Sequence, residues 1–373
     1  MTDLSLPVPS ALRDDPGDRA YATLFDGGLE LEAGGHLDAI TVAYETWGAL
    51  NPTATNAVLV LHALTGDSHA AGKIGPGHPS PGWWDGLVGP GGPIDTDRCF
   101  VVCPNVLGGC GGTTGPASGA PDATPYGSRF PTVTIRDQVT VEAALADHLG
   151  IQQWAGVIGG SMGGMRALEW CIGHPDRVRR ALVLAVGAAA TAEQIGLCSL
   201  QIRAIRADPA FHGGDYYGES RWPLEGMAIA RGIGQVSYRT PDELEARFGS
   251  APNGERDPLR GGSYSIESYL RHQGDKLAHR FDPNSYVVLS EAMNHHDVGR
   301  GRGGIPSALG RIRAEVTVAG IATDRLYPIA SQYELARLLP SPTDVCVIDS
   351  LSGHDGFLIE VDTVGRILKE VLR

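Results

Sequence analysis

Short apolar runs recur along this chain and predict strands that are covered on both faces. They occupy residues 57–61, 100–103, 155–158, 181–186, 315–321 and 345–348, and a further short strand is expected at residues 40–45. Such uninterrupted runs are typical of a parallel sheet that lies between layers of helices. Segments with apolar residues at helical spacing lie between them, and the clearest, residues 135–149, ends at Gly150. The alternation of strand and helix patterns predicts an α/β fold with a mostly parallel sheet.

The pattern changes between residues 191 and 304, where strand-like runs disappear and helical periodicity takes over. One face of a predicted helix carries Ile266, Tyr269, Leu270, Gln273 and Leu277. Thr240-Pro-Asp-Glu243 has the form of a capping box with proline at the first helical position. We therefore predict a core made of residues 21–190 and 305–373, interrupted by a helical lid insertion over residues 191–304. Residues 1–20 are expected to form a loose tail.

Composition and charge narrow the possible partners and the compartment. Of the 373 residues, 20% are charged and 42% are hydrophobic, as in ordinary folded proteins. The formal net charge of −13 argues against nucleic acid or an anionic membrane as a partner. Residues 1–20 hold no apolar segment of the signal-peptide kind, and the longest run of small and apolar residues, 181–190, is too short to cross a bilayer. We therefore expect a cytoplasmic protein.

The cysteine pattern does not favour a metal site or a disulfide framework. The six cysteines form no Cys-x-x-Cys pair, and no His-x-x-x-His partner accompanies them; they are Cys99, Cys103, Cys110, Cys171, Cys198 and Cys346. In a cytoplasmic protein, cysteines of this kind are reduced and packed as small apolar residues. We therefore expect no bound metal.

The sequence around Ser161 predicts a sharp turn between a strand and a helix. Gly159-Gly-Ser-Met-Gly163 has the spacing Gly-x-Ser-x-Gly, an apolar run precedes it, and a helical pattern that ends at Gly173-His-Pro175 follows it. This context is that of the nucleophile elbow of α/β-hydrolase folds, where small residues flank the serine because strand and helix approach closely. Ser161 is therefore the candidate nucleophile.

Two backbone amides are candidates for stabilising an oxyanion beside Ser161. Met162 stands at the start of the predicted helix, where N–H groups lack helical acceptors. In this fold the loop after an earlier core strand supplies a second donor, which we assign to Leu64 within His62-Ala-Leu-Thr-Gly-Asp67. We interpret His62 itself as a structural hydrogen-bonding residue, because no carboxylate is assigned to it.

A glycine-rich loop follows the strand at residues 100–103. Residues 104–116 hold five glycines between Gly108 and Gly115, but neither the Walker lysine spacing nor Gly-x-Gly-x-x-Gly before a helix is present. We interpret this segment as a shaped loop beside the active site, and a phosphate cradle is the alternative.

Asp324 and His354 complete a candidate catalytic triad with Ser161. Each lies just beyond the end of a predicted strand, where parallel sheets place their chemistry. The order serine, aspartate, histidine is also that of α/β-hydrolase enzymes. His354 would take the proton from Ser161, and Asp324 would orient the imidazole and stabilise its charged form. The sequence therefore predicts an α/β-hydrolase fold with a serine nucleophile.

Several longer motifs resemble the homoserine O-acetyltransferase family. They are Asn105-Val-Leu-Gly-Gly-Cys-Gly-Gly-Thr-Thr-Gly-Pro116, Gly159-Gly-Ser-Met-Gly-Gly-Met165, Ala167-Leu-Glu-Trp170, Ser237-Tyr-Arg-Thr240 and Gly353-His-Asp-Gly-Phe-Leu358. The resemblance implies acetyl transfer from acetyl-CoA, as co-substrate, to the hydroxyl of L-homoserine in methionine biosynthesis, by a cytoplasmic homodimer without a further cofactor. It also implies that Arg231 and Asp355 bind the amino acid. A zwitterion needs one fixed cation and one fixed anion, and a carboxylate beside His354 would be better placed with an ammonium partner.

Other functions remain open at this level. The same fold serves a homoserine O-succinyltransferase, a serine O-acyltransferase, or a serine esterase from which water is not excluded. A binding protein without catalysis would usually lack one member of the triad, whereas Ser161, Asp324 and His354 are all present.

Overall fold

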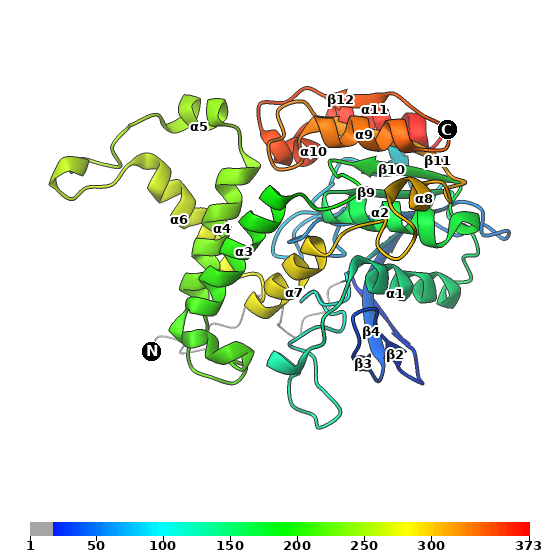
Figure 1. Ribbon diagram of the computed structural model, residues 1–373, viewed down its shortest axis with the longest axis horizontal. Coiled ribbons are helices and arrows are strands. Elements are labelled where there is room, and N and C mark those ends of the chain that lie inside the picture. The colour runs from blue at the N-terminus through cyan, green and yellow to red at the C-terminus, as the bar shows by residue number, and fades with distance from the viewer. Residues whose placement is uncertain (1–17) are drawn as a thin grey trace.

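The computed structural model describes residues 18–373, and its centre is an eight-stranded sheet (Figure 1). In spatial order the strands are β1 (Ala20–Leu24), β4 (Ile40–Trp47), β8 (Phe100–Pro104), β5 (Ala57–Leu61), β9 (Gly156–Gly160), β10 (Arg180–Leu184), β11 (Glu315–Ile321) and β12 (Val345–Ile348). The β1–β4 and β4–β8 pairs are antiparallel, and every other pair in this sheet is parallel. The predicted fold class, an α/β-hydrolase fold with a mostly parallel sheet, is therefore confirmed.

Alternate side chains of the central strands enter two separate apolar layers. In β5, Leu59 and Leu61 belong to one layer, whereas Val58 and Val60 belong to the other. The first layer is covered by α1 (Ile135–His148), α2 (Met162–Gly173) and α9 (Ile329–Leu338). The second is covered by α11 (Val361–Val371) and the loop around Trp84. Because both faces are covered, the strands have no polar face, and this explains their continuous apolar runs.

Helices fill the chain between β10 and β11. They are α3 (Ala192–Ala207), α4 (Leu224–Tyr238), α5 (Pro241–Phe248), α6 (Ser265–Ala278), α7 (Pro283–Asn294) and the short α8 (Ile305–Leu309). Helix α4 packs between α3 and α6, while α5 and the segment after it extend away from the sheet (Figure 1). Helix α7 joins this group to the core, since Tyr286 and Leu289 are buried in the first apolar layer. Of the predicted tail, residues 1–17 lie outside the described part of the chain.

The cap predicted at Thr240 differs from the structure in one detail. Thr240 Oγ1 accepts the N–H of Glu243 at 3.0 Å, and Pro241 begins α5. The Glu243 carboxylate, however, accepts from Arg239 at 3.0 Å instead of from the backbone of Thr240. The expected reciprocal box is thus half formed, because a charge-assisted bond to arginine is stronger than a bond to a neutral amide.

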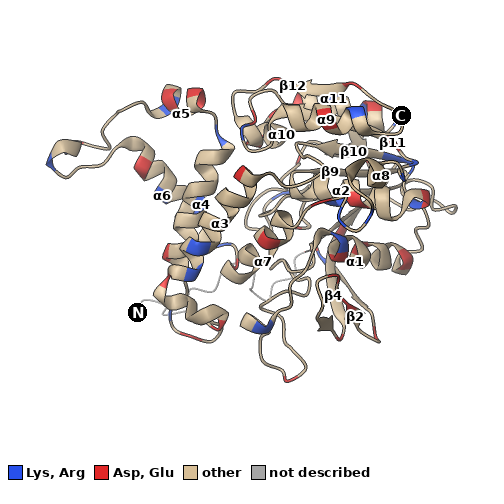
Figure 2. Cartoon of the chain, viewed as in Figure 1, with Lys and Arg blue, Asp and Glu red and all other residues tan. Residues whose placement is uncertain are grey.

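Four short strands of the described chain lie outside the central sheet. Two small sheets pair β2 (Leu29–Glu30) with β3 (His36–Leu37) and β6 (Val88–Gly89) with β7 (Ile94–Asp95). Acidic and basic residues are interspersed along the helices of both the core and the insertion (Figure 2). Within the described residues, each helix is too short or too polar to span a bilayer.

Candidate active site

Ser161 lies in a tight turn between β9 and α2. Its φ of 56° and ψ of −124° are rare for a residue with a side chain, and its N–H is held by Leu184 O at 3.0 Å. A Cβ on Gly159 would lie 2.1 Å from Gly163 O, and one on Gly163 would lie 2.0 Å from Leu61 O. Both positions therefore require glycine. The close approach of strand and helix that these glycines permit holds Ser161 in its strained conformation.

The structure brings Ser161, His354 and Asp324 into one hydrogen-bonded line. His354 Nε2 lies 2.8 Å from Ser161 Oγ, and His354 Nδ1 lies 2.7 Å from Asp324 Oδ2. An ionised carboxylate only accepts hydrogen bonds, so Nδ1 carries the proton and Nε2 is free to accept from the serine hydroxyl. Asp324 Oδ1 in turn accepts the N–H groups of Leu326 and Tyr327 at 2.9 and 2.8 Å. The carboxylate is thus held from both sides.

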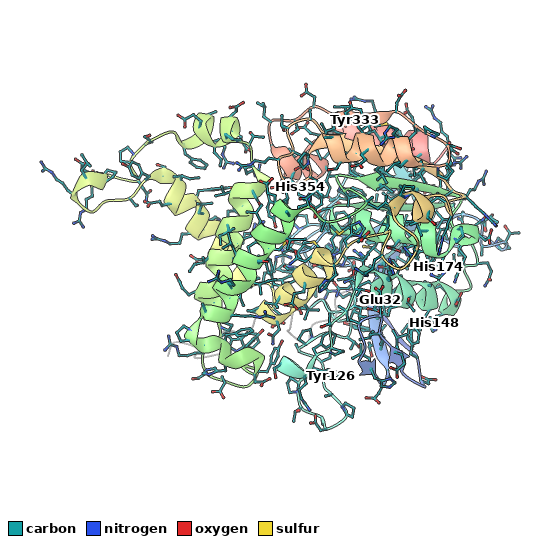
Figure 3. The ribbon with its side chains drawn as sticks, viewed as in Figure 1. Glu32, Tyr126, His148, His174, Tyr333 and His354 are labelled. Carbon is teal, nitrogen blue, oxygen red and sulfur yellow. The ribbon has the colours of Figure 1, made fainter. Side chains whose placement is uncertain are left out.

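Each member of this line follows a parallel strand at the same edge of the sheet. Ser161 follows β9, Asp324 follows β11, and His354 lies in a 3-10 turn, η6 (Gly353–Asp355), after β12. All three are nearly enclosed, with exposed fractions of 7%, 5% and 4% respectively. Figure 3 places His354 where the C-terminal part of the core faces the insertion helices. The candidate nucleophile and its two partners are therefore largely shielded from solvent.

The surroundings of His354 favour its charged form. Burial lowers the imidazole pKa, but the charge and hydrogen bond of Asp324, together with the charge of Asp355, outweigh it and raise the pKa above its ordinary value of 6.5. The ring also stacks on Tyr327, with centroids 4.9 Å apart and planes 27° apart. A base of raised pKa beside a serine is suited to taking its proton during attack and returning it to a leaving group.

The charges around His354 predict that the activity depends on pH. Only neutral His354 acts as a base, so activity should fall as pH decreases through a pKa above 6.5. Asp355→Asn removes one negative charge and should move this acid limb to lower pH, by about one unit or less. The measurement is kcat/KM against pH, with Asp344→Asn, which neutralises an exposed carboxylate before β12, as the control. An unchanged limb in Asp355→Asn would show that this charge does not act on the base.

The two predicted oxyanion donors follow neighbouring strands. Leu61 is paired with Gly159 in the β5–β9 ladder, so the loop that carries Leu64 and the turn that leads to Met162 leave the sheet side by side. Met162 is the first residue of α2, and both residues are buried. Neither N–H donates to an acceptor within residues 18–373. Two amides in this arrangement are available to a negative oxygen that forms on a carbonyl attached to Ser161.

Arg231 lies on α4 and lines a cavity of about 510 Å³ together with Ala63 and Thr65, the neighbours of Leu64. Its Cζ lies 5.3 Å from the centroid of the Tyr238 ring, and its buried Nε has no partner among the described residues. A half-buried guanidinium with an unused, buried Nε donor is suited to binding an anion.

The carboxylate of Asp355 has a partner within the protein. Its Oδ2 forms a salt bridge with Arg239 Nη2 at 3.1 Å. Arg239 follows α4 and also pairs with Glu243, so it connects the insertion to the segment that carries His354. The sequence did not reveal this pair, because the two residues are distant in the chain. An ammonium group at Asp355 would have to share the carboxylate with Arg239.

A buried ion pair, which the sequence alone did not reveal, supports the turn at Ser161. Arg166, on α2 and fully buried, donates to Glu142 Oε1 of α1 at 2.7 Å and to the carbonyl of His62. Trp170 donates its indole N–H to Glu142 Oε2 at 2.7 Å. The only sequence signal was a charged residue within the apolar helix after Ser161. A buried charge must be paired, and here the pairing joins both helices to the loop after β5.

Glu45, His69 and His78 form a buried group whose possible ligand atoms lie within 4.8 Å of one another. The two imidazole rings are stacked, with centroids 3.7 Å apart and planes 10° apart. A metal ion lies near the plane of each imidazole that binds it, and two stacked planes do not meet at a common ion. Glu45 instead accepts from Ser68 and from His69, both at 2.8 Å, so we interpret the group as a structural network. The six cysteines carry free thiols.

The fold and this site define a class: serine acyl-transfer proteins of the α/β-hydrolase fold, with a Ser–His–Asp line at the carboxyl ends of parallel strands. The family model described as alpha/beta hydrolase fold matches residues 56–361. The homoserine O-acetyltransferase of Thermobifida fusca is 57% identical over 370 residues, which cover 98% of this chain and 97% of the relative. The chain belongs to the homoserine O-acetyltransferase family, and the resemblance predicted from its motifs is confirmed.

Solved structures agree with this assignment. The homoserine O-acetyltransferase of Bacillus anthracis has a TM-score of 0.88 at 28% identity, covering 96% of this chain and 98% of that one. Esterase E22 has a TM-score of 0.86 at 28% identity, covering 95% of this chain and 100% of that one. Proteins with names for two different reactions therefore share this fold, and the fold alone does not separate transfer from hydrolysis.

Proposed function

We propose that this protein is an enzyme that transfers the acetyl group of acetyl-CoA to the side-chain hydroxyl of L-homoserine, an early step of methionine biosynthesis. The observation that carries the proposal is identity of 57% to a homoserine O-acetyltransferase along nearly the whole chain, combined with a complete Ser161–His354–Asp324 line. The reaction needs no further cofactor, because a serine nucleophile and a histidine base are sufficient for acyl transfer.

The proposed mechanism has two half-reactions that use the same residues. Ser161 Oγ attacks the thioester carbonyl while His354 takes its proton, and the oxyanion is stabilised by the N–H groups of Leu64 and Met162. The C–S bond then breaks, and His354 returns the proton to the departing CoA thiolate. In the second half, the homoserine hydroxyl attacks the acetyl-enzyme and gives its proton to His354. The C–O bond to Ser161 breaks, and the serine recovers the proton.

Arg231 and Asp355 are the proposed partners of the amino acid. The unused Nε of Arg231 in the cavity beside the oxyanion loop supports a role in binding the homoserine carboxylate. Asp355, adjacent to His354, would bind the ammonium group next to its bridge with Arg239. In a covered site each charge of the zwitterion requires a fixed partner, since an unpaired buried charge is costly.

Replacing Arg231 with alanine is expected to raise the homoserine KM by at least about 30-fold, the equivalent of ~2 kcal/mol for a lost charge pair with the bound amino acid. Acetylation of Ser161 by acetyl-CoA should survive, because homoserine enters only in the second half-reaction. The burst of acyl-enzyme and the homoserine saturation curve are measured separately. Arg206→Ala, which removes a lid arginine paired with Glu291 at the surface, is the control. Unchanged homoserine saturation in Arg231→Ala would remove this residue from the acceptor site.

The donor and the acceptor are tested together by a substrate panel. Acetyl-, propionyl- and succinyl-CoA are each combined with L-homoserine, L-serine or water, and the products are identified by mass. We expect O-acetylhomoserine as the dominant product, with little free CoA when the acceptor is absent. Dominant succinyl transfer or transfer to serine would replace the proposed substrates, and equal CoA release without an acceptor would identify an esterase, the activity named for esterase E22.

We further propose that the protein acts as a cytoplasmic homodimer. Exposed apolar residues on two packed insertion helices support the dimer: Ile195 and Leu200 of α3 and Ile229 and Val236 of α4 are 38–52% exposed. Large apolar side chains exposed on adjacent helices are found at interfaces between subunits. Sedimentation equilibrium tests this assembly, and a single species of 39.3 kDa would contradict it.

A further inference from the structure

Two hydrogen bonds hold the carbonyl group of the peptide bond between Ala63 and Leu64. Ala63 O lies 2.8 Å from His62 Nδ1 and accepts the N–H of Gly66 at 2.9 Å. A planar trans peptide carries its C=O and N–H on opposite edges. Fixing the Ala63 carbonyl therefore also fixes the direction of the Leu64 N–H, one of the two proposed oxyanion donors.

The tautomer of His62 follows from a second contact of the same ring. The N–H of Val106, in the glycine-rich loop, donates to His62 Nε2 at 3.1 Å. A ring nitrogen that accepts a hydrogen bond carries no proton, so Nδ1 carries it and donates to Ala63 O. The side chain is 1% exposed, and burial together with Arg166 lowers its pKa to about 3. His62 therefore keeps this neutral tautomer throughout the working pH range of an ordinary enzyme.

The rest of the loop is held in the same manner. The carbonyl of His62 accepts from Arg166 of α2, and the carbonyl of Thr65 accepts from Arg280 Nη2 at 2.7 Å. Gly66 has no room for a side chain, since a Cβ there would lie 2.8 Å from the Cβ of His62. The carbonyls on both sides of Leu64 are thus turned toward protein donors, while the Leu64 N–H has no acceptor within residues 18–373.

We propose that His62 is a positioning residue that fixes the Ala63–Leu64 peptide, so that the Leu64 N–H is directed at the oxyanion formed on Ser161. The proposal rests on the proposed acyl transfer through Ser161. An oxyanion donor is effective only when its direction is set before the reaction, because reorientation during the step would cost free energy. His62 sets that direction through Nδ1 and is itself oriented through Nε2 by the glycine-rich loop. This assigns that loop a role as the support of the oxyanion site.

A matched pair of substitutions separates the two contacts of the ring. His62→Asn would retain an amide N–H near the position of Nδ1, whereas His62→Gln would retain an acceptor near the position of Nε2. We expect His62→Gln to lower kcat about 10- to 100-fold, approaching the loss seen when an oxyanion donor is removed, and His62→Asn to lower it by less than about fivefold. The KM values for both substrates should change little, since the donor acts on the transition state.

A second pair of variants controls for stability. His296 is also buried and also bonds a backbone carbonyl, Gly187 O at 3.0 Å. His296→Asn and His296→Gln are compared with the His62 variants by Tm and by kcat. Equal loss of kcat in the two His62 variants, or losses that follow Tm as in the His296 pair, would overturn the positioning role.

Acylation of Ser161 by 4-nitrophenyl acetate is measured in parallel, because it needs the same oxyanion donors but neither CoA nor homoserine. With this ester we expect the wild type to react fastest, His62→Asn more slowly and His62→Gln most slowly. If the wild type turned over the ester but made no acetylhomoserine, the proposed substrates would be wrong and the His62 comparison would still be decided by the ester rates.

Discussion

Replacing Ser161 with alanine is expected to abolish acetyl transfer, with a loss in kcat of about a million-fold, as for removal of a serine nucleophile from a triad. Ser161 Oγ is the group that His354 Nε2 contacts at 2.8 Å, and alanine leaves the base with no hydroxyl to activate. Intact-mass analysis after mixing with acetyl-CoA alone should show one acetyl adduct on the wild type and none on the variant. Steady-state kinetics of the wild type should give parallel lines, as expected for two half-reactions.

Alanine at position 161 should leave the fold intact. Its small side chain fits the space of the serine, and the backbone bond from residue 161 to Leu184 O is retained. An unchanged Tm together with tight acetyl-CoA binding would show that only the chemistry is lost. Intersecting kinetic lines without an adduct would contradict a covalent intermediate and favour direct attack by homoserine.

Removing the base or its orienting carboxylate should have the second largest effect. His354→Ala is expected to lower kcat by about a million-fold, and Asp324→Asn by about ten-thousand-fold. The base moves the proton, whereas Asp324 holds the imidazole in the tautomer that accepts from Ser161 and stabilises its cation. An amide at position 324 would present a donor to Nδ1 and favour the wrong tautomer. The measurement is single-turnover acetylation, which isolates the first half-reaction.

The double variant distinguishes cooperation from independent effects. Because the two residues act as a unit, His354→Ala with Asp324→Asn should be no slower than His354→Ala alone. Asp324 also accepts two backbone N–H groups, so Tm is measured to exclude a loss caused by unfolding. A rate for Asp324→Asn within a few-fold of wild type would mean that another carboxylate orients His354.

Much of the core could be predicted because its causes are local. The continuous apolar runs in β5 and β10 follow from burial on both faces of the sheet. The turn at Ser161 was predictable because a Cβ at position 159 or 163 would lie only 2.1 or 2.0 Å from a backbone oxygen, which excludes every residue but glycine there. Asp324 and His354 could be assigned because each directly follows a strand, and parallel strands end at one edge.

Other features depend on segments that are distant in the sequence. Arg239 meets Asp355 only because the end of α4 packs beside the turn that carries His354. The Glu142–Arg166 pair likewise requires α1 and α2 to lie together, and it is this packing that provides the partner each buried charge needs. No local pattern predicts such pairs, since arginine and glutamate usually lie on exposed helix faces.

His62 illustrates both what the sequence determines and what depends on the tertiary structure. By itself the sequence determined that this histidine ends a buried strand and precedes the loop assigned to the oxyanion, because strand length and loop position are local properties. Only the tertiary structure decided its partners, Ala63 O on one side and Val106 N–H on the other. The physical reason is that a hydrogen bond depends on direction and on distances of about 3 Å, which are set when the loops after β5 and β8 come together in the folded chain.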